Sequence, residues 1–210
     1  PKPQVASSIL AGIIRSPVVT THLERLDQAV IPPAVLEVLK GLLDGGHHAY
    51  LVGGCVRDML RGEKPKDFDL ATSARPDEVQ QLFKRVIPTG IEHGTVTVVV
   101  RGVHVEVTTF RAEADYVDGR RPSKVEFHTD IEADLSRRDF TINAMALEPL
   151  SKKLVDPFDG QGDLAAKRIR CVRSAMERFL EDGLRAMRAV RFATVLGFEI
   201  EPDTEAAIPQ

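Results

Sequence analysis

YLVGGCVRDMLRGEKPKDFDLATS, residues 50–73, combines a glycine pair with two closely spaced acids. An apolar run ends at a glycine pair, Gly53 and Gly54, and a short basic segment with helical spacing follows directly. A second apolar run then carries two acids one residue apart, Asp67 and Asp69. The pattern predicts a strand, a glycine turn, a short helix and a second strand that bears two carboxylates.

The paired acids predict a metal site at this second strand. Residues two apart in a strand point to the same face, so Asp67 and Asp69 are expected to project together while Phe68 and Leu70 face the core. Two neighbouring carboxylates repel one another unless a cation neutralises them. If the later strand VHVEVTT lies alongside, Glu106 adds a third carboxylate, and such oxygen ligands suit Mg²⁺. For the DFD motif by itself, a solvent-exposed strand face without a metal is an equally good interpretation.

The glycine pair favours a phosphate site beside the acids. Gly53 and Gly54 let the backbone approach a ligand closely, and the helix that follows offers free N–H groups and the positive end of its dipole. Arg57 lies one turn into that helix and can donate two hydrogen bonds to a phosphate. A lone Gly-Gly pair is usually only a turn. Its spacing to Arg57 and to the paired acids indicates a triphosphate and metal site.

The rest of the chain predicts a small mixed sheet flanked by helices. A helix over 173–196 carries one apolar stripe, formed by Leu180, Leu184, Met187 and Val190. The order of elements predicts an α+β or mixed α/β fold with a helical C-terminal part. The remaining predicted elements are helices over 32–46, 56–62 and 75–86, strands over 48–54 and 67–72, and a hairpin over 94–111 that turns at Arg101 and Gly102.

The composition is that of an ordinary globular protein whose binding signals are local. The chain has 210 residues, of which 43% are hydrophobic and 28% charged, and its net charge of −3 gives no global signal for nucleic acid. Residues 160–195 nevertheless hold eight basic and four acidic side chains, which form a local basic patch. Cys55 and Cys171 offer no disulfide framework and no metal-ligand spacing, so each is expected to be a buried core residue.

The sequence predicts no membrane span, and its two end segments predict a leader and a truncated chain. No apolar run approaches the roughly 18–20 residues that a membrane span needs, and we expect a cytoplasmic protein. Residues 1–27 are read as a flexible leader, with an organelle transit segment as the alternative. The chain does not begin with Met, and Thr204 resembles a helix N-cap with little sequence after it, so we expect a fragment of a longer protein.

Six motifs occur in an order that resembles one protein family. They resemble the head and neck of the bacterial tRNA nucleotidyltransferase/poly(A) polymerase family, within the polymerase-beta-like nucleotidyltransferases. The resemblance covers about residues 28–200. It implies a leader over 1–27, a head domain over 28–165 and the start of a truncated helical neck domain over 166–210. The motifs are LVGGCVRDMLRGEKPKDFDLATS, HGTVTVVVRGVHVEVTTFR, DYVDGRRPSKVEF, DLSRRDFTINAMAL, DPFDGQGDL and EDGLRAMRAVRF.

The resemblance implies a role for each matching residue. Asp67 and Asp69 are similar to the family's Mg²⁺ ligands, with two ions when nucleotide is bound, and Glu106 to the carboxylate that orients or activates the primer hydroxyl. The implied reaction is attack of a 3′-hydroxyl on the nucleotide α-phosphate, with release of pyrophosphate. Nucleotide contacts are implied for Gly53, Gly54, Arg57 and Arg138 on the phosphate side and for Asp139 and Asn143 on the ribose side.

The resemblance also implies base selection by the last motif. Asp182, Arg185, Arg188 and Arg191 recur every third residue and are predicted to form a ridge along one helical side. Cytosine and adenine both present an amine beside a ring acceptor, which suits the acceptor of Asp182 and the donor of Arg185. Arg188 and Arg191 are then further nucleotide contacts. The alternative is a solvated charged face with ion pairs within the helix.

The resemblance favours addition of CCA, or of its terminal A, to the 3′ end of tRNA, with ATP and CTP as substrates. Residues 88–99 resemble the CCA-adding branch more than the poly(A) branch. The loop over 112–124 has full length, whereas enzymes of the family that add only CC have it shortened. Two alternatives stay open: a poly(A) polymerase acting on mRNA 3′ ends, and a non-catalytic RNA- or nucleotide-binding module, against which the intact acids count.

Overall fold

The computed structural model describes Leu26, residues 30–111 and residues 130–208. Apart from Leu26, the predicted leader over 1–27 lies outside the described residues, and so does the predicted loop over 112–124.

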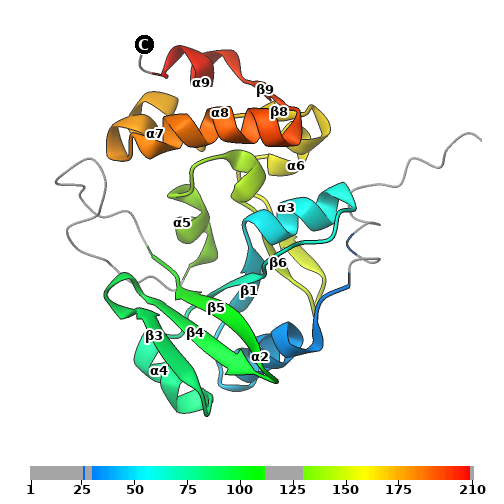
Figure 1. Ribbon diagram of the computed structural model, residues 1–210, viewed down its shortest axis with the longest axis vertical. Coiled ribbons are helices and arrows are strands. Elements are labelled where there is room, and N and C mark those ends of the chain that lie inside the picture. Colours follow the sequence, from blue (N-terminus) through cyan, green and yellow to red (C-terminus); the bar gives the residue numbers. More distant parts are fainter. Residues whose placement is uncertain (1–25, 27–29, 112–129, 209–210) are drawn as a thin grey trace, which may run out of the picture.

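The described residues form a seven-stranded mixed sheet in the order β3-β4-β5-β2-β1-β6-β7 (Figure 1). Only β2 and β5 pair in parallel, and the other neighbouring strands are antiparallel. With its flanking helices, this sheet confirms the predicted α+β fold. The strands are β1 (Ala49–Val52), β2 (Asp69–Thr72), β3 (Val86–Gly90), β4 (Thr95–Val100), β5 (Val103–Thr109), β6 (Ala146–Glu148) and β7 (Lys153–Val155).

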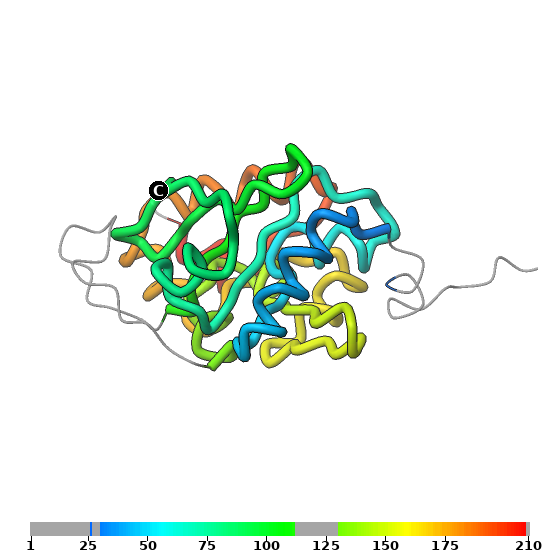
Figure 2. The backbone as a smooth tube through the Cα atoms, turned by 90° about the horizontal axis from the view of Figure 1, so that it is seen from below, coloured from blue at the N-terminus to red at the C-terminus, as the bar shows by residue number. Residues whose placement is uncertain are grey.

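One face of the sheet is apolar and packs against the helix α2 (Pro33–Asp44). Alternate strand residues such as Leu70 and Val107 are buried on this face, as the two-residue period of a strand requires. The helix contributes Leu39 and Leu42, both fully buried in the same cluster. Figure 2 shows α2 lying at the end of the molecule opposite the C-terminal helices. The intervening polar residues of β2 and β5 are left on the opposite face.

The glycine pair makes the turn that the sequence predicts. Gly53 has φ 72° and ψ −131°, a conformation that side-chain-bearing residues rarely adopt, and it is the N-cap of α3 (Gly54–Arg61). The helix ends at Gly62, which has a left-handed conformation. The chain therefore turns at the end of β1 and enters α3, which lies between the sheet and the C-terminal helices (Figure 1).

Residues 160–206, which follow the last strand of the sheet, form a mainly helical layer at the end of the molecule away from α2 (Figure 1). In this layer α8 (Leu184–Leu196) runs across the molecule, with α9 (Pro202–Ala206) on its outer side. The short helix α5 (Ile131–Ser136) and a 3₁₀ turn at Thr141–Asn143 lie between this layer and the sheet. The remaining elements are α6 (Gly160–Ala165), β8 (Arg168–Ile169), α7 (Ala175–Glu181) and β9 (Glu199–Ile200).

The predicted helix over 75–86 is too long. The helix α4 covers Pro76–Leu82, and Phe83 has an extended conformation. Val86 and Ile87 instead belong to β3, paired with Val98 and Thr97 of β4. Two consecutive β-branched residues favour a strand, and the free edge of β4 supplies the backbone partners that a helix end would lack.

The predicted helix over 173–196 is wrong as a single element. It is divided into α7 and α8, because Asp182 has an extended conformation and Gly183 is the N-cap of α8. The predicted apolar stripe is exposed rather than buried: Leu180 and Met187 are each 71% exposed. The buried face of α8 carries Ala189 and Phe192 instead, which join the main hydrophobic cluster. Leu184, Met187 and Val190 all lie on α8, so their helical period is real, but a period alone does not show which face of a helix meets the core.

Three further sequence predictions bear on the fold. Cys55 and Cys171 are buried and unbridged, as expected. In the described part of the chain, no helix combines the length and apolarity needed to cross a membrane. The division between a head over 28–165 and a neck over 166–210 stays a prediction, because side chains from both parts share one hydrophobic cluster.

Candidate active site

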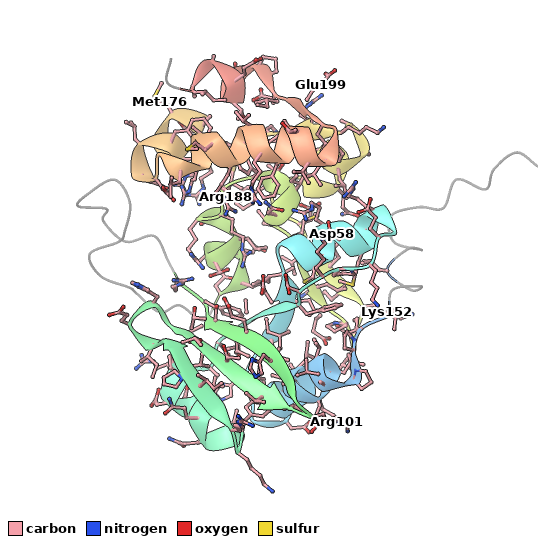
Figure 3. All side chains as sticks on the ribbon, in the orientation of Figure 1. Asp58, Arg101, Lys152, Met176, Arg188 and Glu199 are labelled. Carbon is pink, nitrogen blue, oxygen red and sulfur yellow. The ribbon has the colours of Figure 1, made fainter. Side chains whose placement is uncertain are left out.

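A cavity of about 1040 Å³ lies between the polar face of the sheet, α3 and α8. Figure 3 shows Arg188 on the lower side of α8, toward the head, and Asp58 on α3. A smaller cavity of about 500 Å³, lined by Tyr50 and Phe110 among others, contains none of the predicted site residues. The larger cavity is lined by all thirteen predicted residues: Gly53, Gly54, Arg57, Asp67, Asp69, Glu106, Arg138, Asp139, Asn143, Asp182, Arg185, Arg188 and Arg191.

Two of the predicted acids are direct neighbours across the parallel strands. Asp69 of β2 is in register with Glu106 of β5, so both side chains leave the sheet on the same face. Asp67 lies just before β2 rather than within it, and its side chain is exposed. The hairpin therefore lies beside the acidic strand, as the sequence predicts.

The predicted cluster of three carboxylates, Asp67, Asp69 and Glu106, stays a prediction. Among the residues described, no three His, Cys, Asp or Glu side chains are arranged to hold a metal ion by themselves. The oxygen donors still fit a hard divalent cation that completes its shell with water and substrate phosphate oxygens.

The pKa values of Asp69 and Glu106 are both shifted by burial and by neighbouring charges. Desolvation by the surrounding protein raises the pKa of Asp69; Arg138 opposes this effect, and the negative charge of Asp67 adds to it. Desolvation likewise raises the pKa of Glu106, Asp69 adds to the increase, and Arg111 opposes it. Both carboxylates remain open to the cavity, so a bound cation can relieve the repulsion.

Guanidinium groups converge on the glycine turn. Arg57 donates to Asn143 Oδ1 at 2.8 Å and pairs with Asp58 at 2.8 Å, which fixes its side chain at the start of α3. A Cβ built on Gly53 lies 3.0 Å from a terminal nitrogen of Arg138. The Nε of Arg138 is buried and has no hydrogen-bond acceptor among the residues described. The turn therefore combines backbone N–H groups with two arginines, an arrangement that suits phosphate oxygens.

A buried acid that sequence reasoning missed holds these arginines in place. Asp134 is fully buried in α5 and accepts hydrogen bonds from Arg137 at 2.7 Å and from Arg138 at 3.1 Å. It also accepts from the backbone N–H of Arg111 at 3.2 Å. Burial alone raises the pKa of Asp134, but the charges of Arg137 and Arg138 and their hydrogen bonds outweigh it, so this pKa is lowered. An Asp three residues before an Arg-Arg pair was the available sequence signal.

Asp139, which is predicted to contact the ribose together with Asn143, forms an ion pair with Arg188 of α8. Asp139 Oδ2 accepts from Arg188 Nε at 2.7 Å, and Asn143 donates to Asp139 Oδ1 at 3.3 Å. Asp139 and Asn143 are buried, whereas Arg188 is nearly half exposed. This contact connects the 3₁₀ segment of the head to the helical layer.

The predicted ridge on the last motif is wrong in its geometry. Asp182 lies outside α8, and its Oδ1 accepts from the N–H of Leu184, the first residue of that helix, at 2.9 Å. Arg185 is buried and pairs with Glu181 at 2.5 Å, and it donates to the carbonyl oxygen of Arg137 at 3.2 Å. Both side chains still border the cavity, so the break before α8 places them there without a continuous helical ridge.

Phe192 is a second residue that sequence reasoning missed. Its ring lies under the guanidinium groups of Arg57, Arg188 and Arg191, whose Cζ atoms are 5.5, 5.5 and 4.6 Å from the ring centroid. Phe140 contacts Phe192 in a T-shaped pair with centroids 5.8 Å apart. The aromatic residue directly after Arg191 in RAVRF was the only available signal.

Residues 49–170 match the family described as "Poly A polymerase head domain", which is more than half of the chain. The chain belongs to this family. The match to the poly A polymerase head domain begins at β1 and ends just after β8, so it contains the glycine turn, both acidic strands and the segment from α5 to the 3₁₀ turn.

Curated relatives and solved structures agree with this head-domain match. The CCA-adding enzyme of Lactobacillus johnsonii is 53% identical over 175 residues, which are 83% of this chain and 44% of the relative. The CCA-adding enzyme of Bacillus subtilis is 51% identical over 173 residues, 82% of this chain and 43% of the relative. This chain therefore spans less than half the length of these relatives.

Two solved structures illustrate the shared fold. A crystal structure of the Bacillus stearothermophilus CCA-adding enzyme in complex with CTP is 44% identical, with a TM-score of 0.77, over 85% of this chain and 43% of that chain. A tRNA nucleotidyltransferase complexed with a primer tRNA and an incoming ATP analog is 34% identical, with a TM-score of 0.65, over 81% of this chain and 48% of that chain.

Proposed function

We propose that this chain is the nucleotide-adding part of a template-independent nucleotidyltransferase that adds CMP and AMP to the 3′ end of tRNA. The observation that carries the proposal is the pairing of Asp69 with Glu106 in a cavity that also receives Arg57, Arg138 and Arg188. Carboxylates on one wall and guanidinium groups on the other suit a metal-bound triphosphate. The CCA-adding relatives support this choice among phosphoryl-transfer reactions.

The acids serve the reacting end of the nucleotide. Mg²⁺, as two ions held by Asp67 and Asp69, would supply positive charge to the α-phosphate and the pyrophosphate leaving group. Glu106 accepts a hydrogen bond from the primer 3′-hydroxyl and orients its oxygen toward the α-phosphorus. As that oxygen forms the new P–O bond, its proton passes to the Glu106 carboxylate, the bond from the α-phosphorus to the oxygen that bridges to the β-phosphate breaks, and pyrophosphate leaves.

The glycine turn and its arginines bind the leaving phosphates. Gly53 and Gly54 bring backbone N–H groups close to the triphosphate, and Arg57 and Arg138 donate to its oxygens. Asp134 positions Arg138, since it fixes one of its terminal nitrogens. The glycine turn and its two arginines thereby stabilise the negative charge of the two phosphates that leave as pyrophosphate.

The opposite wall binds the nucleoside. Asp139 and Asn143 contact the ribose, and Arg188 and Arg191 add contacts from α8. Asp182 accepts from the exocyclic amine of cytosine or adenine, and Arg185 donates to the ring nitrogen. Uracil and guanine present the opposite pattern, which places an acceptor against the Asp182 carboxylate. ATP and CTP are therefore the preferred nucleotides.

A second candidate is favoured by the family match itself. The matched family is described as a poly A polymerase head domain, so addition of a poly(A) tail to an mRNA 3′ end uses the same residues. Either activity places the protein in the cytoplasm with tRNA or mRNA as its nucleic acid partner. A non-catalytic nucleotide-binding module would keep the cavity but would not need Asp69 and Glu106 as neighbours.

One experiment separates these candidates. The chain is incubated with Mg²⁺, tRNAs that lack CCA, CA or A, and either each of the four nucleotides in turn or CTP and ATP together; product length and pyrophosphate are measured. Completion of CCA and no further growth is the expected result. An A tail that grows on any RNA would favour the poly(A) candidate. Nucleotide binding without any pyrophosphate release would favour the non-catalytic module.

A further inference from the structure

Three cationic side chains from two layers of the molecule converge on one aromatic ring. Arg57 comes from α3 in the head, whereas Arg188 and Arg191 come from α8. All three Cζ atoms lie within 5.5 Å of the Phe192 centroid. A cation within about 6 Å of a ring centroid is attracted by the negative charge above the ring face. Phe192 therefore offsets part of the mutual repulsion of these guanidinium groups.

The three arginines differ in their other partners. Arg57 is held by Asp58 and Asn143, and Arg188 is held by Asp139. In the described part of the chain, Arg191 pairs with no carboxylate and donates no side-chain hydrogen bond, although it borders the cavity. Its contact with the Phe192 ring, at 4.6 Å, is also the shortest of the three. Of the three, Arg191 thus depends most on the ring.

The position of Phe192 suits an electrostatic role. Its side chain is 9% exposed, so little water screens the attraction between the ring and the guanidinium groups. Phe140 contacts it in a T-shaped pair with an interplanar angle of 83°, which limits rotation of the ring. A leucine would fill similar space, but it has no ring charge distribution to hold a cation.

We propose that Phe192 is a positioning residue for nucleotide binding, which holds Arg191, together with Arg57 and Arg188, over the cavity by cation–π attraction. The proposal rests on the function proposed above. Because the ring acts through the arginines, weakening its negative face should weaken nucleotide binding even when its size and burial are nearly unchanged.

A series of fluorinated phenylalanines at position 192 tests this inference. Successive fluorines withdraw charge from the ring face with little change in shape. With 4-fluoro-, 3,5-difluoro- and 3,4,5-trifluorophenylalanine, we expect the Kd of the chain for CTP and ATP in Mg²⁺ to rise stepwise, to about tenfold for the trifluoro ring. Phe192→Leu is expected to give at least the same loss. Isothermal titration calorimetry measures each Kd.

Phe110 provides the matched control. It is fully buried and pairs with Tyr50 at a centroid distance of 6.1 Å, outside the larger cavity. The same fluorinated series at Phe110 should leave the Kd unchanged. In an Arg191→Gln background, fluorination of Phe192 should have a smaller effect, since the most dependent cation is absent.

The possible failures are distinguishable. A Kd that is insensitive to fluorination at Phe192, with a lowered melting temperature for Phe192→Leu, would mean that the ring only fills the core, and the inference would be overturned. An undiminished effect in the Arg191→Gln background would overturn the role of Arg191. Failure of the unsubstituted chain to bind either nucleotide would instead reject the proposed function.

Discussion

Asp69 stands directly beside Glu106 across the single parallel pair of strands in the sheet, and both carboxylates open into the same cavity. Register, rather than proximity in sequence, brings them together. The pKa of Glu106 is raised mainly by burial, and the negative charge of Asp69 raises it further. Two neighbouring carboxylates repel one another unless a cation neutralises them, as the metal assignment proposed above requires.

Asp69→Asn is expected to separate activity from stability. Loss of one metal-binding charge should lower nucleotide addition by at least about 100-fold, the scale of losing one preorganised electrostatic contact. The melting temperature of the metal-free chain should not fall, because a repulsive charge is removed. The measurements are nucleotide incorporation into tRNA and thermal unfolding.

Asp44→Asn is the control for this substitution, since Asp44 is exposed and pairs with the exposed Lys40 on α2. It should leave activity unchanged. Retained turnover in Asp69→Asn with Mg²⁺ would contradict the metal assignment, and the same test applies to Asp67→Asn.

Glu106→Gln should reduce kcat more than it raises the KM for nucleotide. The substitution keeps the size of the side chain but weakens its ability to orient the primer hydroxyl, for which a loss of about 10²–10⁴ in kcat is expected. Steady-state kinetics with CTP measure both constants. Glu37→Gln, at an exposed partner of Arg101, is the control. A change confined to KM would instead make Glu106 a nucleotide-binding residue.

Asp134→Asn should destabilise the protein in a pH-dependent way. Asp134 is fully buried between Arg137 and Arg138, so removing its charge leaves two guanidinium groups unpaired and should cost about 3–5 kcal/mol at neutral pH. Denaturant unfolding at neutral and acidic pH measures the difference between parent and variant. Nucleotide affinity should fall as well, because Arg138 loses its anchor.

The direction of the pH dependence follows from the lowered pKa of Asp134. A carboxyl whose pKa is lowered on folding stabilises the protein fully above its ordinary value of 3.8, and this stabilisation is lost as the pH falls through the folded-state pKa. The parent should therefore approach the stability of Asp134→Asn below that pH. A difference independent of pH would point to altered packing rather than to charge.

Asp182→Ala and Asp182→Ser test base selection separately from the hydrogen bond at the start of α8. Asp182 accepts from the Leu184 N–H at the first residue of α8, a hydrogen bond that serine can keep and alanine cannot. Both variants should use UTP and GTP better relative to CTP and ATP, by about tenfold. Only the alanine variant should lose about 1 kcal/mol of stability. Values of kcat/KM for the four nucleotides, together with unfolding curves, distinguish the two roles. An unchanged nucleotide preference in both variants would mean that Asp182 only accepts the hydrogen bond at the start of α8.

Gly160→Ala and Gly183→Ala should have opposite outcomes. A Cβ on Gly160 would lie 2.4 Å from the carbonyl oxygen of Thr141 and 2.9 Å from Met145 Cγ, both in the buried interior, so a loss of about 1–3 kcal/mol is expected. Gly183 has right-handed helical angles and no atom within 4 Å of its added Cβ, so alanine should be neutral or stabilising by up to about 1 kcal/mol. Equal loss in both would contradict the close packing at Gly160.

The sequence predicts the head of the molecule well because its signals there are local. The glycine turn, the alternating strands and the apolar face of α2 each depend on a period that a short window contains. The placement of Glu106 beside Asp69 also follows, once the hairpin is assumed to lie next to the acidic strand. The start of β2 at Asp69, which leaves Asp67 outside the strand, is a boundary detail that periodicity does not determine.

The C-terminal part is predicted less well because long-range contacts decide it. The break at Asp182 depends on the hydrogen bond at the start of α8 and on the burial of Arg185 against Glu181. Nothing in a helical period distinguishes the buried arginine from the exposed Arg191. The local basic patch is likewise partly neutralised by pairs such as Arg170 with Asp163, which become visible only in three dimensions.

The parallel pairing of β2 with β5 has a consequence for the order of folding. Hairpins such as β4–β5 close short loops, but β2 meets β5 only after α4, β3 and β4 have been enclosed between them. Pairings that close longer loops form slowly, so Asp69 and Glu106 are expected to meet late, after the folding transition state. A cation bound between them should then slow unfolding while leaving the refolding rate nearly unchanged.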